Sequence, residues 1–159
     1  MNRSESENAL REAVAGARHL AGQLEQSRTE LATLLPLSAT DLRALDQSGW
    51  NALYAFQMKF LLLQDLASRR LVRGFLDRAG EDPRGFSMRE ASDRVAELGA
   101  LTSGDDWLQL AVVRNMLVHD YPVDLEQFIF RIVDAHRHCS SLLSNVALLI
   151  EALTESSSA

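Results

Sequence analysis

The sequence predicts an all-α fold, an antiparallel bundle of about five helices. Apolar residues recur at three- and four-residue spacings along most of the chain, which is the period of an amphipathic helix. The 159 residues include only eight glycines and three prolines, so long uninterrupted elements are favoured. No segment alternates apolar and polar residues for long enough to compete as a strand. We expect residues 1–159 to form one helical domain, with residues 153–159 as a frayed tail.

The first helix is expected over residues 5–34, where an amphipathic stripe runs until Pro36 ends it. Ser38 and Asp41 then offer N-caps for a short turn before Gly49. These breaks separate the first long helix from the second.

The second long helix is expected from residue 50 to about residue 78. Residues 60–63 at its centre are apolar on nearly all sides, which predicts a place in the middle of the bundle or at a subunit interface. A turn-rich loop follows. Ser87 and Glu90 then have capping-box spacing and begin a short third helix that ends near Gly99.

Ser103 and Asp106 repeat the capping spacing before a fourth helix, which Pro122 stops. Asp124 caps a fifth helix, which we expect to run to about residue 153. The short connections between these elements favour antiparallel neighbours.

Composition and charge restrict the class of function. No apolar run approaches the ~20 residues of a membrane span, and the opening segment MNRSESENALREA is too acidic and polar for a signal peptide. Cys139 is the only cysteine, which excludes an internal disulfide and fits a reducing cytoplasm. The formal net charge of −6 argues against a nonspecific nucleic-acid coat but leaves room for a small basic cleft. We therefore expect a cytoplasmic protein that does not enter the membrane.

Four chemically active side chains gather in the segment RNMLVHDY, which Pro122 closes: Arg114, Asn115, His119 and Tyr121. An arginine can hold a phosphate through its planar fork of donors, and a histidine can transfer a proton near neutral pH. On an ideal helix Asn115 and His119 are neighbours one turn apart, whereas Arg114 and His119 lie about 140° apart. Joint action by Arg114 and His119 therefore needs an arginine that reaches round, a distorted last turn or a second subunit.

Spacing alone favours structural roles over catalysis. Arg114 can pair with a carboxylate such as Asp65 or Asp106, and a histidine in a last turn is favoured by the helix carboxyl end. Arg69, Arg70 and Arg73 form a basic face that could contact RNA, but we expect it to be a solvated face paired with Asp65, Asp77 and Glu81. The alternative is that Asp65 points toward Arg114.

A metal site is not expected. His136 and Cys139 share a helix face, with His138 nearby, but they are too few for a metal site and indicate structural roles.

The arrangement of Arg114, four residues, His119, one residue and Tyr121, with Asn115 after the arginine, resembles the motif of HepT-type toxins in the HEPN superfamily. The resemblance includes the capped helix that starts at Asp105–Trp107 and the run from Gln64 to Arg73, and it spans roughly residues 42–126. It implies a small all-helical, twofold-dimeric toxin whose two motif helices face a shared cleft. Such toxins are encoded beside a nucleotidyltransferase antitoxin.

The resemblance implies a metal-independent endoribonuclease without a cofactor. Arg114 would hold the scissile phosphate and His119 would act as general acid or base on RNA. Asn115 would donate a hydrogen bond in the same cleft, with Asp65 as a further supporting residue. Tyr121 corresponds to the tyrosine that the antitoxin modifies with adenylate, and added phosphates there would block the cleft.

Two alternatives remain open. Asp120 places an anion beside the expected RNA site, and the whole chain is acidic, which favours a noncatalytic substrate-binding or regulatory partner of the nucleotidyltransferase. A plain helical scaffold is the third possibility.

Overall fold

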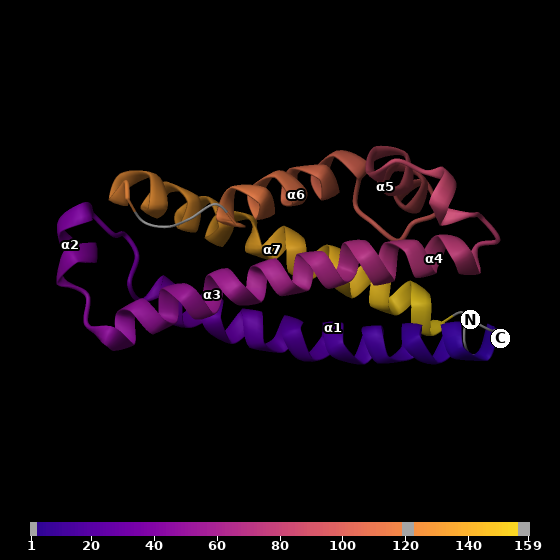
Figure 1. Ribbon diagram of the computed structural model, residues 1–159, viewed down its shortest axis with the longest axis horizontal. Coiled ribbons are helices and arrows are strands. Elements are labelled where there is room, and N and C mark those ends of the chain that lie inside the picture. Colours follow the sequence, from indigo (N-terminus) through magenta and orange to yellow (C-terminus); the bar gives the residue numbers. More distant parts are fainter. Residues whose placement is uncertain (1–2, 119–122, 156–159) are drawn as a thin grey trace.

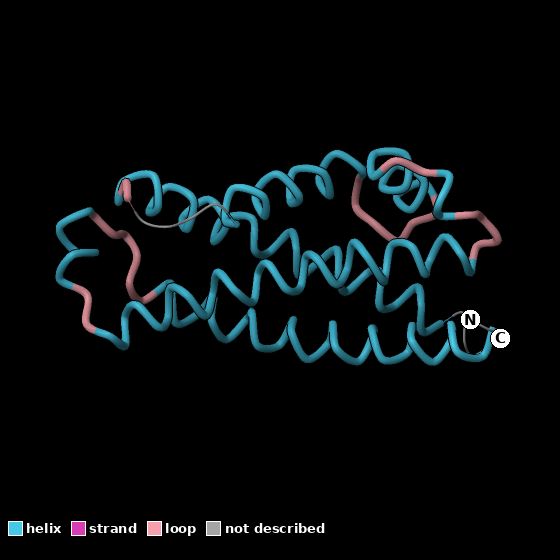
Figure 2. The backbone as a smooth tube through the Cα atoms, in the orientation of Figure 1, coloured by secondary structure: helices cyan, strands magenta, loops and turns pink. Residues whose placement is uncertain are grey.

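Long helices run back and forth along one axis of the molecule, as the computed structural model shows (Figure 1). The structure describes residues 3–118 and 123–155, and Figure 2 shows only helices and loops within these ranges. In chain order the elements are α1 (Arg3–Ala32), α2 (Ala39–Ala44), α3 (Gln47–Leu66), the π-helix η1 (Ala67–Val72), α4 (Arg73–Arg78), the 3-10 helix η2 (Pro83–Gly85), α5 (Met88–Glu97), α6 (Gly104–Val118) and α7 (Leu125–Glu155). The prediction of an all-α helical bundle is confirmed.

Taken in chain order, α1, α3 with α4, α6 and α7 alternate in direction, so α3 with α4 runs parallel to α7, and the core lies between these helices (Figure 1). The largest side chains with no exposed surface come from three different helices: Phe56 and Phe60 of α3, Trp107 of α6 and, at 1% exposure, Phe128 of α7. Each such side chain stabilises the fold by roughly 1.5–3 kcal/mol relative to an exposed position. Phe60 and Leu63 of the apolar centre of α3 therefore face the core, whereas Leu62 between them is 47% exposed.

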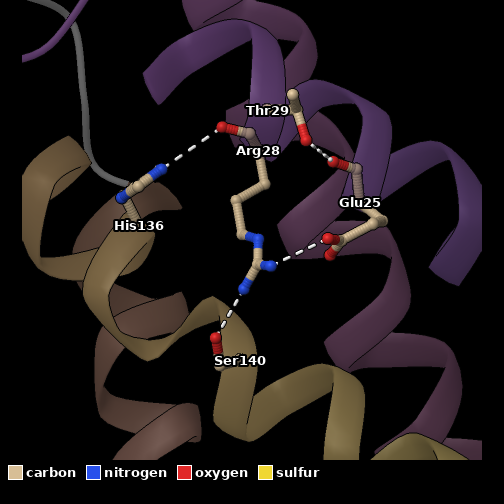
Figure 3. Close-up of polar contacts among 5 residues, drawn as sticks. All are labelled: Glu25, Arg28, Thr29, His136 and Ser140. Carbon is tan, nitrogen blue, oxygen red and sulfur yellow. Dashed lines mark hydrogen bonds and ion pairs between the residues drawn. The ribbon is translucent and has the colours of Figure 1, made fainter. Parts of the chain in front are cut away.

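Polar contacts tie α1 to α7 along their outer edge (Figure 3). Arg28 bridges the two helices, because its guanidinium pairs with Glu25 at 2.8 Å and also donates to the hydroxyl of Ser140. One turn away, His136 Nε2 lies 3.2 Å from the carbonyl oxygen of Arg28. The ring of His136 also packs against Phe56, with centroids 5.9 Å apart. These contacts give His136 a structural role between two helices.

The expected caps form. The hydroxyl of Ser38 accepts from the backbone N–H of Asp41 at 3.1 Å, and Ser87 caps α5 in the same way with Glu90 at 3.2 Å. Ser103 accepts from the N–H of Asp106 at 3.0 Å, and Asp124 accepts from the N–H of Gln127 at 3.1 Å. The short turn expected after Ser38 is a six-residue helix, α2.

Two boundary predictions are wrong for identifiable reasons. Gly49 is not a break, because Asp46 accepts its N–H at 2.8 Å and starts α3 at Gln47. The end of this second helix near residue 78 is confirmed, although the helix contains the π-helical turns of η1. The tail does not fray at residue 153, because α7 continues to Glu155 and the side chain of Leu153 is only 2% exposed.

Two features of the helices bear on what the chain can do. Within residues 3–118 and 123–155, no helix has both the length and the apolar composition required to cross a bilayer. The start of α6 packs tightly on α5, since a Cβ at Gly104 would come within 1.9 Å of Asp93 Oδ1 and 3.0 Å of Asp93 N. This close approach fixes where α6, which carries Arg114, begins.

Candidate functional site

The candidate site is built where the second half of α6 packs across α3. Buried residues at three- and four-residue spacings hold α6 in place: Trp107, Leu110, Val113 and Leu117. Gln57 of α3 donates from Nε2 to the carbonyl oxygen of Leu117 at 2.8 Å, which satisfies one of the orphan carbonyls in the last turn of α6. This packing turns Arg114 toward α3 rather than toward solvent.

Arg114 is half-buried and held by two side chains. Its Nη2 lies 2.8 Å from Asp65 Oδ2, and its Nη1 donates to Asn115 Oδ1 at 3.1 Å. The Arg114 side chain is 24% exposed and that of Asp65 34% exposed. The structure therefore brings together Arg114, Asn115 and Asp65, which resolves the ambiguity over Asp65 in favour of Arg114.

The guanidinium of Arg114 retains unused donors. Its Nε is buried and has no hydrogen-bond partner among the described residues. Because a guanidinium carries five N–H donors, the two bonds to Asp65 and Asn115 leave further N–H groups for an acceptor. An anion that reaches the partly exposed Nη atoms would meet a preoriented cation, but it would compete with the carboxylate of Asp65 for that charge.

His119 and Tyr121 lie outside the described residues, as do Asp120 and Pro122. The described part of α6 ends at Val118, immediately before His119. The expected convergence of Arg114 and His119, the hydrogen bonding of His119 and the accessibility of Tyr121 therefore stay predictions.

Exposed apolar side chains form a row along α3 that precedes Asp65. Tyr54, Met58 and Leu62 recur at four-residue steps along α3 and are 44%, 56% and 47% exposed. Asp65 lies on the same side of α3, three residues after Leu62. Val118, at the end of α6, is also exposed, at 47%. The sequence analysis placed residues 60–63 either in the middle of the bundle or at a subunit interface. It missed Met58, although its spacing from Tyr54 and Leu62 was available as a signal.

The alternative constellation of His136, His138 and Cys139 serves the fold. His138 Nδ1 lies 2.9 Å from the carbonyl oxygen of Asp134, one turn back on α7. Burial raises the pKa of the Cys139 thiol to about 12, so it is not a thiolate near neutral pH. In the part of the chain that the structure describes, no group of three or more metal-ligating side chains comes together.

Comparisons of the chain with models of known families, with curated proteins and with solved structures found no match. The class that the structure defines is an all-helical bundle with a half-buried arginine–carboxylate pair between two helices, beside an exposed apolar stripe.

Proposed function

We propose that this protein is a HEPN-type, HepT-like toxin, a metal-independent endoribonuclease in which Arg114 and His119 act on one phosphodiester. The observation that carries the proposal is the position of Arg114, which Asp65 and Asn115 hold half-buried five residues before His119. A guanidinium whose geometry is already set loses little conformational freedom when it binds a phosphate, so more of its binding energy can act on the transition state.

In the proposed reaction, Arg114 contacts the non-bridging oxygens of the scissile phosphate and stabilises the charge that develops there. His119 takes the proton of the attacking 2′-hydroxyl or delivers one to the leaving 5′-oxygen. Asn115 and Asp65 are positioning residues, because both bond to the Arg114 guanidinium.

The proposed twofold dimer accounts for the apolar stripe beside the site. Tyr54, Met58 and Leu62 present a row of large apolar side chains to solvent, and a second copy would remove them from water. A twofold partner would also place a second motif helix across the cleft, so that Arg114 of one copy could act together with His119 of the other.

Cleavage of RNA by the purified protein in the presence of a chelator tests the nuclease. We expect the wild type to cut and both Arg114→Ala and His119→Ala to lose at least about 100-fold in rate. Arg137→Ala is the control, since Arg137 is exposed and its distance to Asp134 is 3.9 Å. Equal rates for all four proteins would refute the catalytic assignment.

Sedimentation tests the dimer. Met58→Glu with Leu62→Glu should give monomers and remove cleavage, whereas Leu98→Glu, at an exposed position after α5, should stay dimeric. A wild-type monomer at working concentration would argue against the shared cleft.

A second candidate function is a noncatalytic partner of a nucleotidyltransferase, and the Asp65–Arg114 pair is the observation that favours it. A carboxylate already bound to the arginine weakens its attraction for phosphate. Coexpression with a nucleotidyltransferase and measurement of intact mass distinguishes the two. Under both proposals Tyr121 accepts adenylate, and Tyr121→Phe should abolish the added mass. Only under the toxin proposal does this modification also stop RNA cleavage.

A further inference from the structure

A second concentration of arginines lies beyond the Arg114 site on the helix that carries Asp65. A pocket of ≈ 590 Å³ opens between η1 and α4 on one side and the first turns of α1 on the other. The two walls come close enough that a Cβ on Gly74 would meet Leu10 at 2.5 Å. Figure 1 shows this region at the end of the molecule where α4 lies beside the start of α1. Five arginines line the pocket: Arg69, Arg70, Arg73, Arg78 and Arg84.

Two of these arginines are neutralised within the fold. Arg78 pairs with Glu7 at 2.6 Å and also donates to the carbonyl oxygen of Leu153. Arg84 pairs with Asp82 at 2.9 Å. The first pair joins α4 to α1 across the pocket, and the second lies within the turn around η2.

The other three arginines outnumber the acids left to them. A third lining acid, Glu81, is occupied by Arg94 at 2.6 Å, which leaves Asp77. The side chains of Arg69 and Arg70 make no hydrogen bond or ion pair within residues 3–118 and 123–155, and the guanidinium of Arg73 donates only to the carbonyl oxygen of Pro83, at 3.3 Å. Three guanidiniums thus face one carboxylate, in a chain whose net charge is −6.

The π-helical turns of η1 present this charge. Ala67, Ser68, Leu71 and Val72 are buried, and Arg69 and Arg70 are exposed on the opposite side of η1. Short π-helical segments interrupt α-helices rarely and often at functional sites.

The spacing of the arginines matches a strand that leaves the Arg114 site. Arg69 follows Asp65 by four residues and Arg73 follows Arg69 by four, so the three lie along one side of the continuous helix. Each step is about 6 Å in an α-helix and somewhat less through π-helical turns, a distance on the scale of one nucleotide. Successive phosphates of a single strand could each meet one guanidinium.

We propose that the pocket binds the backbone phosphates of the RNA strand whose scissile phosphate lies at Arg114. This inference rests on the proposed function and deepens it, because it assigns the direction in which the substrate leaves the cleavage site. Guanidiniums bind phosphate oxygens through paired N–H donors and carry no base readout, so this subsite adds affinity without sequence preference. The apolar row of Tyr54, Met58 and Leu62 lies on the other side of Asp65, so a dimer contact there leaves the subsite open.

Fluorescence anisotropy with a labelled, unstructured RNA of about 12 nucleotides tests the proposal. The background is the uncut complex of His119→Ala. The test variant adds Arg69→Gln, Arg70→Gln and Arg73→Gln. The control variant adds Arg18→Gln, Arg43→Gln and Arg137→Gln, three exposed positions outside the pocket that change the net charge equally.

We expect the test variant to bind RNA at least tenfold more weakly at moderate salt, with the control variant within about twofold of the parent. The log–log salt dependence of the test variant should fall by about 2, because each single-strand phosphate contact contributes about 0.7. A test variant with lysines in place of the glutamines should recover most of the affinity, which separates charge from folding.

Several results would overturn the proposal. One is equal loss in the test and control variants, and another is no RNA binding by the parent. Binding of ATP but not RNA would assign the pocket to a small nucleotide, and loss of binding only to a coexpressed acidic partner would assign it to a protein surface. If the wild type cleaves RNA through Arg114 while the test variant binds RNA normally, the proposed phosphate subsite is refuted and the nuclease proposal stands. If the pocket binds RNA but neither the wild type nor any variant cleaves it, only the proposal of nuclease activity is refuted.

Discussion

The contact between Arg114 and Asp65 predicts a measurable energetic coupling between α6 and α3. The N–O distance is 2.8 Å and the side chains are 24% and 34% exposed, so the pair is neither fully solvated nor fully buried. Exposed ion pairs contribute about 0.2–1 kcal/mol, and hydrogen bonds to charged groups contribute about 1.5–3 kcal/mol. A coupling of about 1–1.5 kcal/mol follows for this half-buried pair.

Urea unfolding of four proteins measures this coupling: the wild type, Arg114→Ala, Asp65→Ala and the double variant. The pair Arg89–Asp105 is a matched control, since it also joins two helices, at 3.1 Å, but with side chains 62% and 86% exposed. We expect its coupling to stay below about 0.5 kcal/mol. A coupling for Arg114 and Asp65 no larger than that of the control would show that the two side chains do not meet in solution. The preorientation argument for the site would then fail.

Three further outcomes follow from the fold. Gly104→Ala should destabilise the protein by about 1–3 kcal/mol, because the new Cβ collides with the side chain and backbone of Asp93 in α5. Gly22→Ala, whose Cβ would meet no neighbour within 4 Å, should stabilise the protein by about 0.5–1 kcal/mol. Urea unfolding of both variants measures these changes. Burial raises the pKa of Cys139 to about 12, so a thiol reagent near pH 8 should label the native protein at least about 100-fold more slowly than the urea-unfolded chain, and equal rates would contradict the buried position. The Ser87 hydroxyl and backbone N–H hold the pKa of Glu90 below its usual value, so the stability that Glu90 adds is present above that usual pKa and is lost as the pH falls. The difference in free energy of unfolding between wild type and Glu90→Gln should therefore narrow between about pH 7 and pH 3. A difference that stays constant with pH would exclude the capping box.

Helix type and the caps could be predicted from the sequence because both depend on local spacing. Ser87 and Glu90 stand three residues apart, and a hydroxyl at an N-cap reaches the N–H three residues on whatever the rest of the fold does. The same holds for the apolar period of α6 and α7. By contrast, the sequence of residues 67–72 carries no local pattern that distinguishes the π-helical turns of η1 from an ordinary α-helix.

The candidate site, too, could be predicted from the sequence only in part. The sequence supplied the residue types, since Arg114 and Asn115 are adjacent and both stand near the end of one helix. It could not decide whether Asp65 pairs with Arg114 or with the arginines after it, because a sequence separation of 49 between Asp65 and Arg114 places no constraint on their distance. The packing of α6 across α3 places Arg114 against Asp65.

The amino-acid sequence by itself determined an all-helical chain, the positions of its caps and the order of the residues that could act on a phosphate. Only the tertiary structure decided that Arg114 faces Asp65, that Tyr54, Met58 and Leu62 remain exposed, and that Arg69, Arg70 and Arg73 line a pocket with α1. The reason is physical: helix period and capping depend on neighbours within about one turn, whereas ion pairing and exposure depend on which helix faces cover one another.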